Sequence, residues 1–385
     1  MASLTLQQVL NRFRDRYEQQ HPISTRQAQV CRHIQQCRTI DLGGEFLACR
    51  QCPYQRIQYH SCRDRHCPQC QYRATEAWAD KQCQQVLPTK YFHVVFTLPH
   101  ELNPLAQLHP DVVYRLLFQS VWKTLRHFGQ SAHLGGQLGL LAILHTWGQN
   151  LSFHIHLHCL IPAGAWDASQ QRWLPCKANG NYLFPVKALS TYYRGAMVRA
   201  LRRARKRGEF TRLTDEPDFS AVLNTLMSKP WCVYSKRYLK RAESVISYLA
   251  RYTFKTAISN KRLIEMDDEH VRFSWRDYRD GQRKIMPLKG DAFIQRFLQH
   301  TLPKGFMRIR RYGFLANALS AKQVAAIRQV LASESTQASN SEAEENNSPK
   351  PKSVNQRFCP HCQQDSLYTI DWIIPQFLRR LKRRR

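Results

Sequence analysis

The sequence is short of acidic residues and of long apolar runs. Of its 385 residues, 28 are Asp or Glu and 58 are Lys or Arg, which leaves a formal net charge of +30. A surface this positive attracts phosphate polyanions or anionic membranes. The most apolar stretches, such as residues 139–144, are far shorter than the roughly 20 residues that a membrane-spanning helix needs. These two shortages argue against a membrane-spanning protein and favour a polyanionic partner.

An apolar signal segment is missing as well. Residues 1–16 contain charges and glutamines where a secretory signal would have an apolar run, so we expect a cytosolic, cytoplasmic protein. The hydrophobic fraction of 43% and the aromatic fraction of 11% are ordinary, and they allow a sizeable core. The length predicts two to three domains of about 150 residues.

Cysteine, in contrast, is abundant. The chain has 13 cysteines, and seven of them fall between positions 31 and 70. Random placement would give about 0.4 pairs of the type Cys-x-x-Cys, and in a reducing compartment such a cluster predicts metal ligands before disulfides. The pairs present are Cys49/Cys52, Cys67/Cys70 and Cys359/Cys362.

The first two pairs are spaced as in a zinc ribbon, and we predict that they hold one structural zinc ion between them. Other zinc-compatible ligands lie nearby, so the sequence leaves open whether one or two zinc ions bind. They are Cys37, Cys62 and His66, with His33, His60 or Cys31 as a fourth. The pair Cys359/Cys362 either completes a zinc site with distant ligands or is a pair of tail thiols, and we favour the tail thiols. Arginines surround the first cluster, Arg63 and Arg65 among them, and predict a DNA-binding module.

Apolar periodicity predicts an α+β fold with a largely antiparallel central sheet flanked by helices. The expected helices are an amphipathic helix within residues 1–30, then 107–128, 189–207 and 236–255. The expected strands are 91–98, 138–146 and 153–161, followed by a hairpin of 271–277 and 283–287 around Asp280-Gly281.

Residues 153–161 carry three histidines in strict alternation. In a strand, His154, His156 and His158 project from one face while the apolar residues between them pack behind. Chance would produce such a triplet about 0.03 times. Two adjacent imidazoles on one face lie ~7 Å apart along the strand, close enough to share one ion with a third ligand. A half-buried strand with a solvated histidine face is the alternative interpretation.

Two imidazoles and an oxygen ligand would leave open positions on Mg²⁺ or Mn²⁺, which can then polarise a phosphodiester. Gln149, seven residues before His156, is one candidate for the third ligand, and His154 is the other. A loop amide bonded to the backbone is an equally good interpretation of Gln149.

Tyr248 and Tyr252 are four residues apart, on one face of the expected helix. Alone the pair means little, because chance gives about 0.7 such pairs. A tyrosine hydroxyl is a poor nucleophile unless a metal and cationic neighbours stabilise the transition state. Arg251 and Lys255 are such neighbours, so the pair gains meaning beside the histidines.

Together these motifs resemble a known family, the rolling-circle insertion-sequence transposases with two catalytic tyrosines, which belong to the single-strand nucleases with a His-hydrophobic-His motif. The resemblance extends to about Val330. It covers residues 37–39, 59–71, 93–99, 145–151, 248–252, 257–260, 277–281, 302–306 and 310–313. Ile155 stands where the family usually has proline, and residues 162–165 stand where it tends to have glycines. Neither departure removes a chemical group.

The resemblance implies that His156 and His158 bind the catalytic metal and that Tyr248 and Tyr252 form 5′-phosphotyrosine intermediates. It implies a bacterial, nucleoid-associated transposase that cuts and joins single-stranded transposon ends and target DNA, with its oligomeric state left open. The alternatives are a replication initiator or relaxase, and a non-catalytic zinc-dependent DNA-binding regulator. The absence of a Gly-x-x-x-x-Gly-Lys-Ser/Thr loop argues against a fused helicase. The expected division is an N-terminal helix (1–30), a zinc-binding domain (31–84), a nuclease domain (85–332), a linker (333–356) and a Cys-x-x-Cys and basic tail (357–385).

Overall fold

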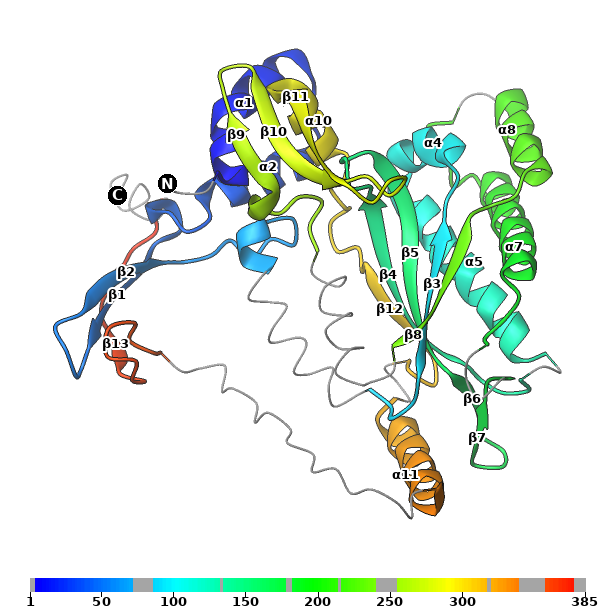
Figure 1. Cartoon of the computed structure of the whole chain (residues 1–385). Helices are drawn as coiled ribbons and strands as arrows, with labels where there is room; N and C mark the ends of the chain where they lie inside the picture. The colour runs from blue at the N-terminus through cyan, green and yellow to red at the C-terminus, as the bar shows by residue number, and fades with distance from the viewer. Residues whose placement is uncertain are drawn as a thin grey trace.

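The structure, a computed structural model, describes residues 4–71, 86–131, 134–177, 182–213, 216–239, 255–316, 320–338 and 357–376. These residues form helices and antiparallel sheets, which confirms the α+β prediction. Figure 1 shows a five-stranded sheet flanked by helices, a second group of helices and strands beside its upper end, and a small sheet that stands apart. No helix in the described part of the chain is long and apolar enough to cross a bilayer.

The chain begins with two helices, α1 (Leu6–Gln20) and α2 (Thr25–Gln36), and each starts with a capping box. The side chains of Thr5 and Ser24 accept the backbone N–H of Gln8 and Gln27, whose own side chains bond back to the capping residues. These reciprocal bonds satisfy N–H groups that a first helical turn leaves unpaired. The expected amphipathic helix is α1, and Ser24 starts a second helix.

The central sheet has the strand order β12-β4-β5-β3-β8, and every neighbouring pair is antiparallel. Its strands are β3 (Tyr91–Thr97), β4 (Gly139–Trp147), β5 (Phe153–Pro162), β8 (Val233–Leu239) and β12 (Ile309–Gly313). The first three match the strands predicted from the sequence. β5 lies in the middle, so side chains of β3 and β4 flank its own on both sides.

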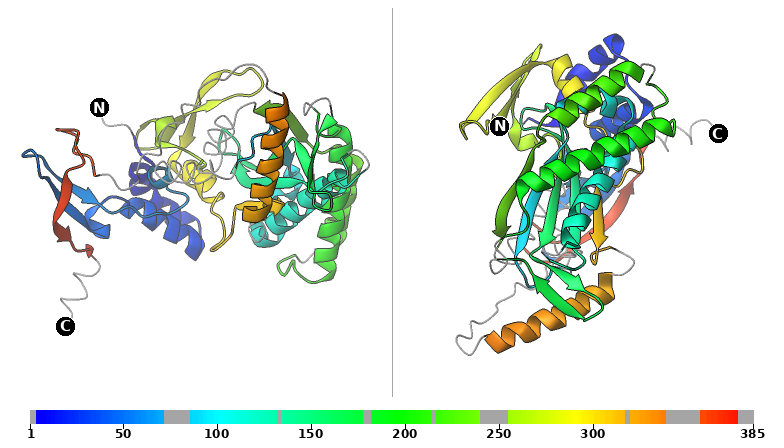
Figure 2. Two further views of the ribbon diagram at one scale, coloured as in Figure 1. Left: turned by 90° about the horizontal axis from the view of Figure 1, so that it is seen from below. Right: turned by 90° about the vertical axis from the view of Figure 1, so that its right-hand side faces the viewer.

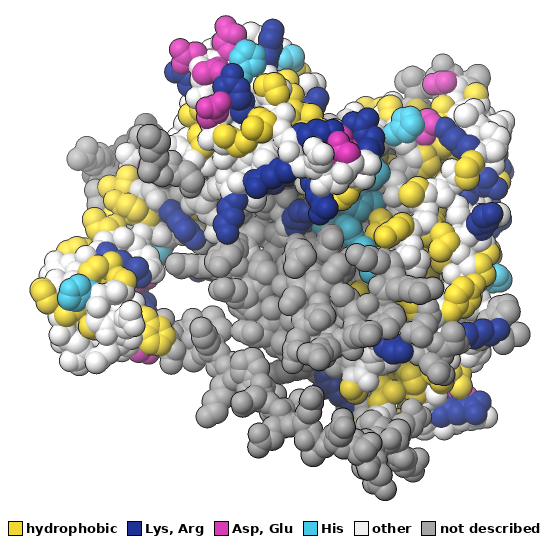
Figure 3. Space-filling view, viewed as in Figure 1, with side chains coloured by type: hydrophobic (Ala, Val, Ile, Leu, Met, Phe, Trp, Pro, Cys, Tyr) yellow, Lys and Arg dark blue, Asp and Glu magenta, His cyan; other side chains and the backbone are white. Residues whose placement is uncertain are grey.

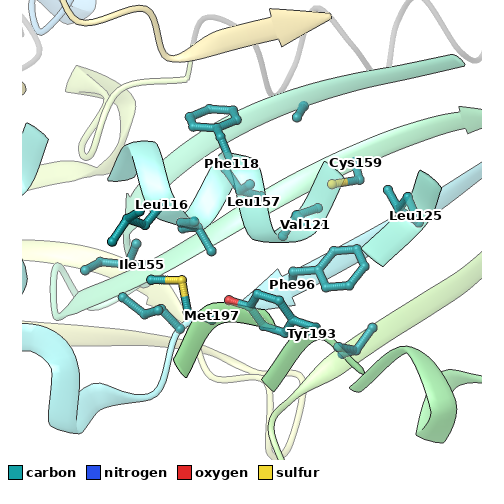
Figure 4. Packing of buried hydrophobic residues seen from close by; sticks show 14 of the residues in the cluster. Phe96, Leu116, Phe118, Val121, Leu125, Ile155, Leu157, Cys159, Tyr193 and Met197 are labelled. Atoms are coloured by element: carbon teal, nitrogen blue, oxygen red, sulfur yellow. The ribbon is translucent and has the colours of Figure 1, made fainter. Parts of the chain in front are cut away.

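One face of this sheet is apolar and packs against helices (Figure 1 and Figure 2). The helices are α4 (Asn103–Leu108), α5 (Pro110–Gly129), α7 (Val186–Lys206) and α8 (Glu216–Ser228). Ile155, Leu157 and Cys159 of β5 lie in this core with Phe118 of α5 and Met197 of α7 (Figure 4). Because strand residues alternate between faces, the histidines of β5 point to the other side of the sheet.

The opposite face carries a smaller core at one end. Leu141, Ile143 and Leu160 of the sheet join Trp166 and Phe314 there. Trp166 belongs to the hairpin of β6 (Gly164–Asp167) and β7 (Arg172–Pro175), and α11 (Ser320–Ala338) packs on the same cluster. His145, His156 and His158 lie farther along the same face.

A second core joins the N-terminal helices to residues 257–298. There α1 packs on α10 (Gly290–Leu298) so closely that a Cβ at Gly290 would lie 2.1 Å from the ring of Phe13. Beside them, β9 (Leu263–Met266), β10 (His270–Arg276) and β11 (Arg283–Lys289) form an antiparallel sheet, in which β10 and β11 are the predicted hairpin. Trp147 and Leu151 belong to this core too, so it is anchored to the end of β4.

The third sheet combines the two ends of the chain, with the order β13-β1-β2. Its strands are β1 (Gly44–Cys49), β2 (Gln55–Tyr59) and β13 (Leu367–Ile373), paired antiparallel. It stands out from the rest of the molecule (Figure 1 and Figure 2). We refer to these three strands as the end sheet.

Two elements differ from those expected. Residues 236–239, expected to begin a helix that continues to Lys255, belong to β8, where pairing with β3 overrides the local helical periodicity. Residues 240–254 lie outside the described residues. Residues 333–338, expected in a linker, extend α11, and the remainder of that linker, 339–356, lies outside the described residues.

Candidate functional site

The turn between β4 and β5 sets the register of the candidate site. The N–H of Gly148 donates to the carbonyl of Ser152 (2.9 Å) and closes the turn. The second core holds this turn through Arg262, Arg296 and Gln299, which donate to the carbonyls of residues 149, 150 and 151. A bulge between His145 and Trp147 then shifts the register by one residue, which puts His145 of β4 directly opposite His156 of β5.

Three histidines converge on this face of the sheet. One ring nitrogen each of His145, His156 and His158 lies within 4.8 Å of the other two. His145 is 2% exposed and His156 is 9% exposed. Burial, with a contribution from nearby cationic groups, lowers the pKa of His156 to about 3 and the pKa of His158 well below its ordinary value. Both imidazoles are therefore neutral at pH 7, which is the form that binds metal.

Hydrogen bonds aim the ring nitrogens of the two β5 histidines. Nδ1 of His156 lies 2.9 Å from the carbonyl oxygen of His154. Since a carbonyl only accepts, Nδ1 carries the proton and Nε2 carries the lone pair. That Nε2 lies 3.1 Å from Nε2 of His158. Two nitrogen ligands about 2.1 Å from one ion are roughly 3.0–3.4 Å apart, so this separation suits a shared cation.

A fourth histidine, His93 of β3, lies beside His158. Its Nε2 is 2.9 Å from Nδ1 of His158, and the two rings stack with centroids 5.1 Å apart. When His158 donates from Nδ1 to His93, its Nε2 lone pair is left facing His156. His93 is thus placed to fix the tautomer of His158.

The donor set of this site fits a divalent cation. All three converging ligand atoms are imidazole nitrogens. Such nitrogens suit Mn²⁺ and the later first-row metals better than Mg²⁺, which prefers oxygen. Three protein ligands also leave positions for water or substrate oxygens. The histidines can therefore act as the protein part of a metal-assisted reaction centre.

Neither predicted candidate for the third ligand is among the three converging nitrogens, although the ring centroid of His154 lies 5.0 Å from that of His156. The side-chain amide of Gln149 donates to the hydroxyl of Tyr278 (3.0 Å) at the turn. His154 shares the face of β5 with His156 but is exposed. The third converging imidazole is that of His145, which the sequence motifs did not indicate.

The predicted nucleophiles Tyr248 and Tyr252 lie outside the described residues, and so does Arg251. Lys255, the first described residue after them, acts on the histidines electrostatically, because its positive charge contributes to the lowered pKa of both His156 and His158. Its carbonyl accepts a bond from the buried Arg308 (3.4 Å). Lys255 therefore connects the candidate metal centre to the segment that contains the two tyrosines.

Cysteines gather in two clusters of four, and the first consists of Cys37, Cys62, Cys67 and Cys70. Sulfur–sulfur separations within it are 3.5, 3.5 and 3.7 Å. Four thiolates around zinc, each about 2.3 Å from the ion, are spaced by about 3.8 Å, whereas a disulfide bond is about 2.05 Å long. The first cluster has the dimensions of a structural zinc site.

The second cluster, Cys49, Cys52, Cys359 and Cys362, corrects two expectations. The pairs Cys49/Cys52 and Cys67/Cys70 do not share one ion, because β1 and β2 carry the first pair into the end sheet. The pair Cys359/Cys362 is not a pair of tail thiols, because the antiparallel pairing of β13 with β1 brings it to Cys49.

His66, expected as a further zinc ligand, belongs to neither cluster. Its Nδ1 lies 2.8 Å from a carboxylate oxygen of Asp64, and its Nε2 accepts the N–H of Leu302 (3.1 Å). Burial raises the pKa of Asp64, but bonds from His66 outweigh it and hold that pKa well below its ordinary value. Arg65 donates to the carbonyl of Phe306. These contacts join the first cluster to the segment before β12.

Comparison with known proteins identifies families for the N-terminal cysteine-containing region and for the region that contains the histidines. Residues 9–98 match the family model "Transposase zinc-binding domain", and residues 139–324 match the model "Putative transposase". The chain is 40% identical over 382 residues to "Putative transposase y4qJ" of Sinorhizobium fredii, an alignment that covers 94% of each chain. The chain belongs to this transposase family.

A more distant relative of this transposase is the "Transposase for insertion sequence element IS801" of Pseudomonas savastanoi pv. phaseolicola. The two are 26% identical over 307 residues, which cover 77% of this chain and 72% of the relative. No solved structure matches the chain. The resemblance stated from the sequence motifs is confirmed at the level of the insertion-sequence transposase family, and the zinc-binding match together with the cysteine clusters supports bound zinc.

A transposase binds DNA, and positive charge lies close to the candidate metal centre. In the space-filling view a patch of histidine side chains lies next to a group of Lys and Arg side chains (Figure 3). Of the described residues predicted to bind DNA, Lys255 acts on the histidines and Arg63 is exposed beside the first cysteine cluster. Arg65, in contrast, is partly buried and bonded to a backbone carbonyl, which gives it a structural role.

Proposed function

We propose that this transposase cuts and joins single-stranded DNA, with Tyr248 and Tyr252 as nucleophiles and a divalent cation held by His145, His156 and His158. The observation that carries the proposal is the convergence of three imidazoles on one face of the sheet. The positive charge of Lys255 is close enough to contribute to the lowered pKa of two of them, His156 and His158. A centre of neutral ligands and cationic neighbours attracts a phosphodiester. The names of the relatives favour a transposase over a replication initiator.

The three imidazoles are suited to hold the cation from one side. When bound, the cation would polarise the scissile phosphate and offset charge on the leaving oxygen. His156 presents its Nε2 because its Nδ1 is bonded to a carbonyl, and His93 favours the matching tautomer of His158. Because all three ligands are nitrogens, we expect Mn²⁺ to bind more tightly than Mg²⁺.

Chain connectivity supports a role for the tyrosines at this centre. Tyr252 precedes Lys255 by three residues, so their Cα atoms are at most about 11 Å apart. Lys255 in turn lies close enough to His156 and His158 to lower their pKa. The four-residue spacing from Tyr252 to Tyr248 would place both hydroxyls on one side of a helix.

In the proposed step, the Oη of one tyrosine attacks phosphorus and the bond from phosphorus to the 3′ oxygen breaks. The tyrosine hydroxyl loses its proton, and the leaving 3′ oxygen gains one. The 5′ phosphate stays on the tyrosine as a phosphodiester, so a 3′-hydroxyl can later reverse the step. Lys255 would stabilise the negative charge that develops on the phosphate oxygens. A second tyrosine allows a second cleavage before the first is resolved.

A single-stranded oligonucleotide, labelled at one end or the other, tests the proposal on a denaturing gel after incubation with Mn²⁺. The 3′-labelled strand should migrate with the protein, and the 5′-labelled strand should appear as a shorter product. Tyr248→Phe or Tyr252→Phe alone should leave single cleavage detectable, whereas the double change should leave no adduct. Tyr182→Phe, at a tyrosine that is 45% exposed, is the matched control.

Three outcomes would contradict parts of the proposal. A shifted band from the double tyrosine variant would mean that another residue is the nucleophile. A protein-bound 5′ label would mean the opposite polarity of attack. Equal cleavage of the same sequence as a duplex would refute the preference for single strands.

A further inference from the structure

The second cysteine cluster joins residues from the two ends of the chain. Cys49 and Cys362 are 313 positions apart, and Cys52 and Cys359 are 307 positions apart. The zinc-binding family match ends at residue 98, so it includes only half of this cluster. We propose that the four cysteines form a second zinc site, which fastens the C-terminal segment 357–376 to the N-terminal strands of the end sheet.

The sulfur geometry is that of a tetrahedral zinc site. The Sγ atoms of Cys49 and Cys362, and those of Cys52 and Cys359, are each 3.6 Å apart, and all four lie within 4.8 Å of one another. Tetrahedral zinc spaces its sulfurs by about 3.8 Å. The first cluster, whose four cysteines all lie within the zinc-binding match, has the same spacing. The two clusters are therefore equivalent in size.

The local sequence and backbone repeat as well. Residues 359–363 read Cys-Pro-His-Cys-Gln, and residues 67–71 of the first cluster read Cys-Pro-Gln-Cys-Gln. In both turns the N–H of the glutamine donates to the carbonyl of the first cysteine, at 2.8 Å from Gln363 to Cys359 and at 3.2 Å from Gln71 to Cys67. The two segments therefore share a Cys-Pro-x-Cys-Gln sequence and one backbone hydrogen bond.

A left-handed residue after a cysteine is a further shared feature. A positive φ is uncommon for residues other than glycine. Arg38, Arg63 and Gln363 nevertheless have φ values of 59°, 54° and 57°, and each directly follows a cluster cysteine. Two of these residues belong to the first cluster and one belongs to the second, so both clusters contain a left-handed residue directly after a cysteine.

Hydrogen-bond donors point at the sulfur of Cys49. The Ser366 hydroxyl lies 2.9 Å from it, and the N–H of Gln51 lies 3.3 Å from it. Such donors stabilise a thiolate, which is the form that binds zinc. Ser366 belongs to the C-terminal segment and Gln51 to the turn after β1, so both halves of the site contribute a hydrogen-bond donor to the sulfur of Cys49.

The end sheet has little apolar interior of its own. Its hydrophobic cluster consists of Cys49, Cys359 and Leu367, with Cys52, Tyr54 and Cys362 packed against them, so most of it is cysteine. Ile57 and Ile370 on the sheet are 50% and 47% exposed. A core this small does not hold three strands together in water without a cross-link. Zinc would supply that cross-link between the ends of the chain.

Metal content of the full-length protein tests the assignment. Native mass spectrometry should find the same number of zinc ions in the wild type and in Cys232→Ser, a change at an exposed cysteine outside both clusters. The double variant Cys359→Ser, Cys362→Ser should hold one zinc ion fewer, whether or not the three histidines also bind zinc. In the cobalt-substituted proteins, the thiolate-to-cobalt absorption of the double variant should fall by about half. Equal zinc content in the wild type and the double variant would overturn the proposal.

A second measurement keeps every cysteine in place. A protease site inserted between positions 339 and 356 lets the folded chain be cut ahead of the C-terminal segment. The released piece should co-elute with the rest of the protein while zinc is bound, and it should separate after a chelator removes the metal. Separation with zinc present, or retention after complete zinc removal, would refute the fastening role. Neither measurement involves DNA cleavage, so the outcome is independent of the proposed nuclease chemistry.

Discussion

Replacement of His93 by alanine tests how the candidate metal centre is organised. The change removes a ring nitrogen 2.9 Å from Nδ1 of His158 and leaves the three proposed ligands in place. His158 then loses the acceptor that keeps its proton on Nδ1, so its Nε2 offers a lone pair to the metal for only part of the time. Loss of such a partner from a metal-bound histidine typically lowers metal affinity by about 10–100-fold. That range equals about 1.4–2.7 kcal/mol at 25 °C.

Titration of the metal-free protein with Mn²⁺, followed by calorimetry, measures the effect. His93→Gln is the matched control, because its amide oxygen can accept the same bond and should keep the affinity close to that of the wild type. The free energy of unfolding of each metal-free variant shows whether a loss of metal affinity comes from a misoriented ligand or from a destabilised fold. Wild-type affinity in His93→Ala would refute the orienting role. A loss far greater than 100-fold would mean that His93 is itself a ligand.

The remaining predictions concern the third ligand, proton linkage and DNA binding. His145→Ala should weaken Mn²⁺ binding more than Gln149→Ala does, and the reverse order would make Gln149 the ligand. Burial lowers the pKa of His156 and of His300 to about 3 from an ordinary 6.5, so the unfolded chain binds protons that the folded chain excludes. The metal-free protein should therefore lose about 2 kcal/mol of stability per histidine between pH 7 and pH 5; equal urea midpoints at the two pH values would contradict this. Contact with six phosphates of a single strand should give a log–log salt slope of about −4, and a slope near zero in fluorescence anisotropy would mean that the positive charge does not serve DNA binding.

The pattern of residues along a single strand predicted the part of the site that lies on that strand. The alternation in residues 153–161 placed His156 and His158 on one face of β5, because alternation depends only on the strand itself. His145 was missed because its place depends on the register of a hairpin. Counting outward from the turn that joins Gly148 to Ser152 would pair residue 145 with residue 155, but a bulge between His145 and Trp147 shifts the register by one residue and pairs it with residue 156, so the local sequence did not reveal it.

Pairing between strands that are distant in the chain determined the features that the sequence patterns did not predict. The spacing between Cys49/Cys52 and Cys67/Cys70 is compatible with a single zinc ribbon, and only the pairing of β13 with β1 reveals that the two pairs have different partners. In the same way, residues 236–239 have helical periodicity but gain backbone hydrogen bonds as an edge strand beside β3. Both errors concern contacts between segments more than 100 residues apart in the chain.

The most direct test of the central proposal identifies the residue to which DNA becomes joined. Wild-type protein is incubated with a short single-stranded oligonucleotide and Mn²⁺, digested with nuclease and protease, and the nucleotide-bearing peptide is sequenced by mass spectrometry. We predict a 5′-nucleotide phosphate on Tyr248 or Tyr252, and loss of the modified peptide when His145, His156 and His158 are all replaced by alanine. A nucleotide on any other residue, or an undiminished adduct in the triple histidine variant, would contradict the proposed two-tyrosine, metal-assisted mechanism.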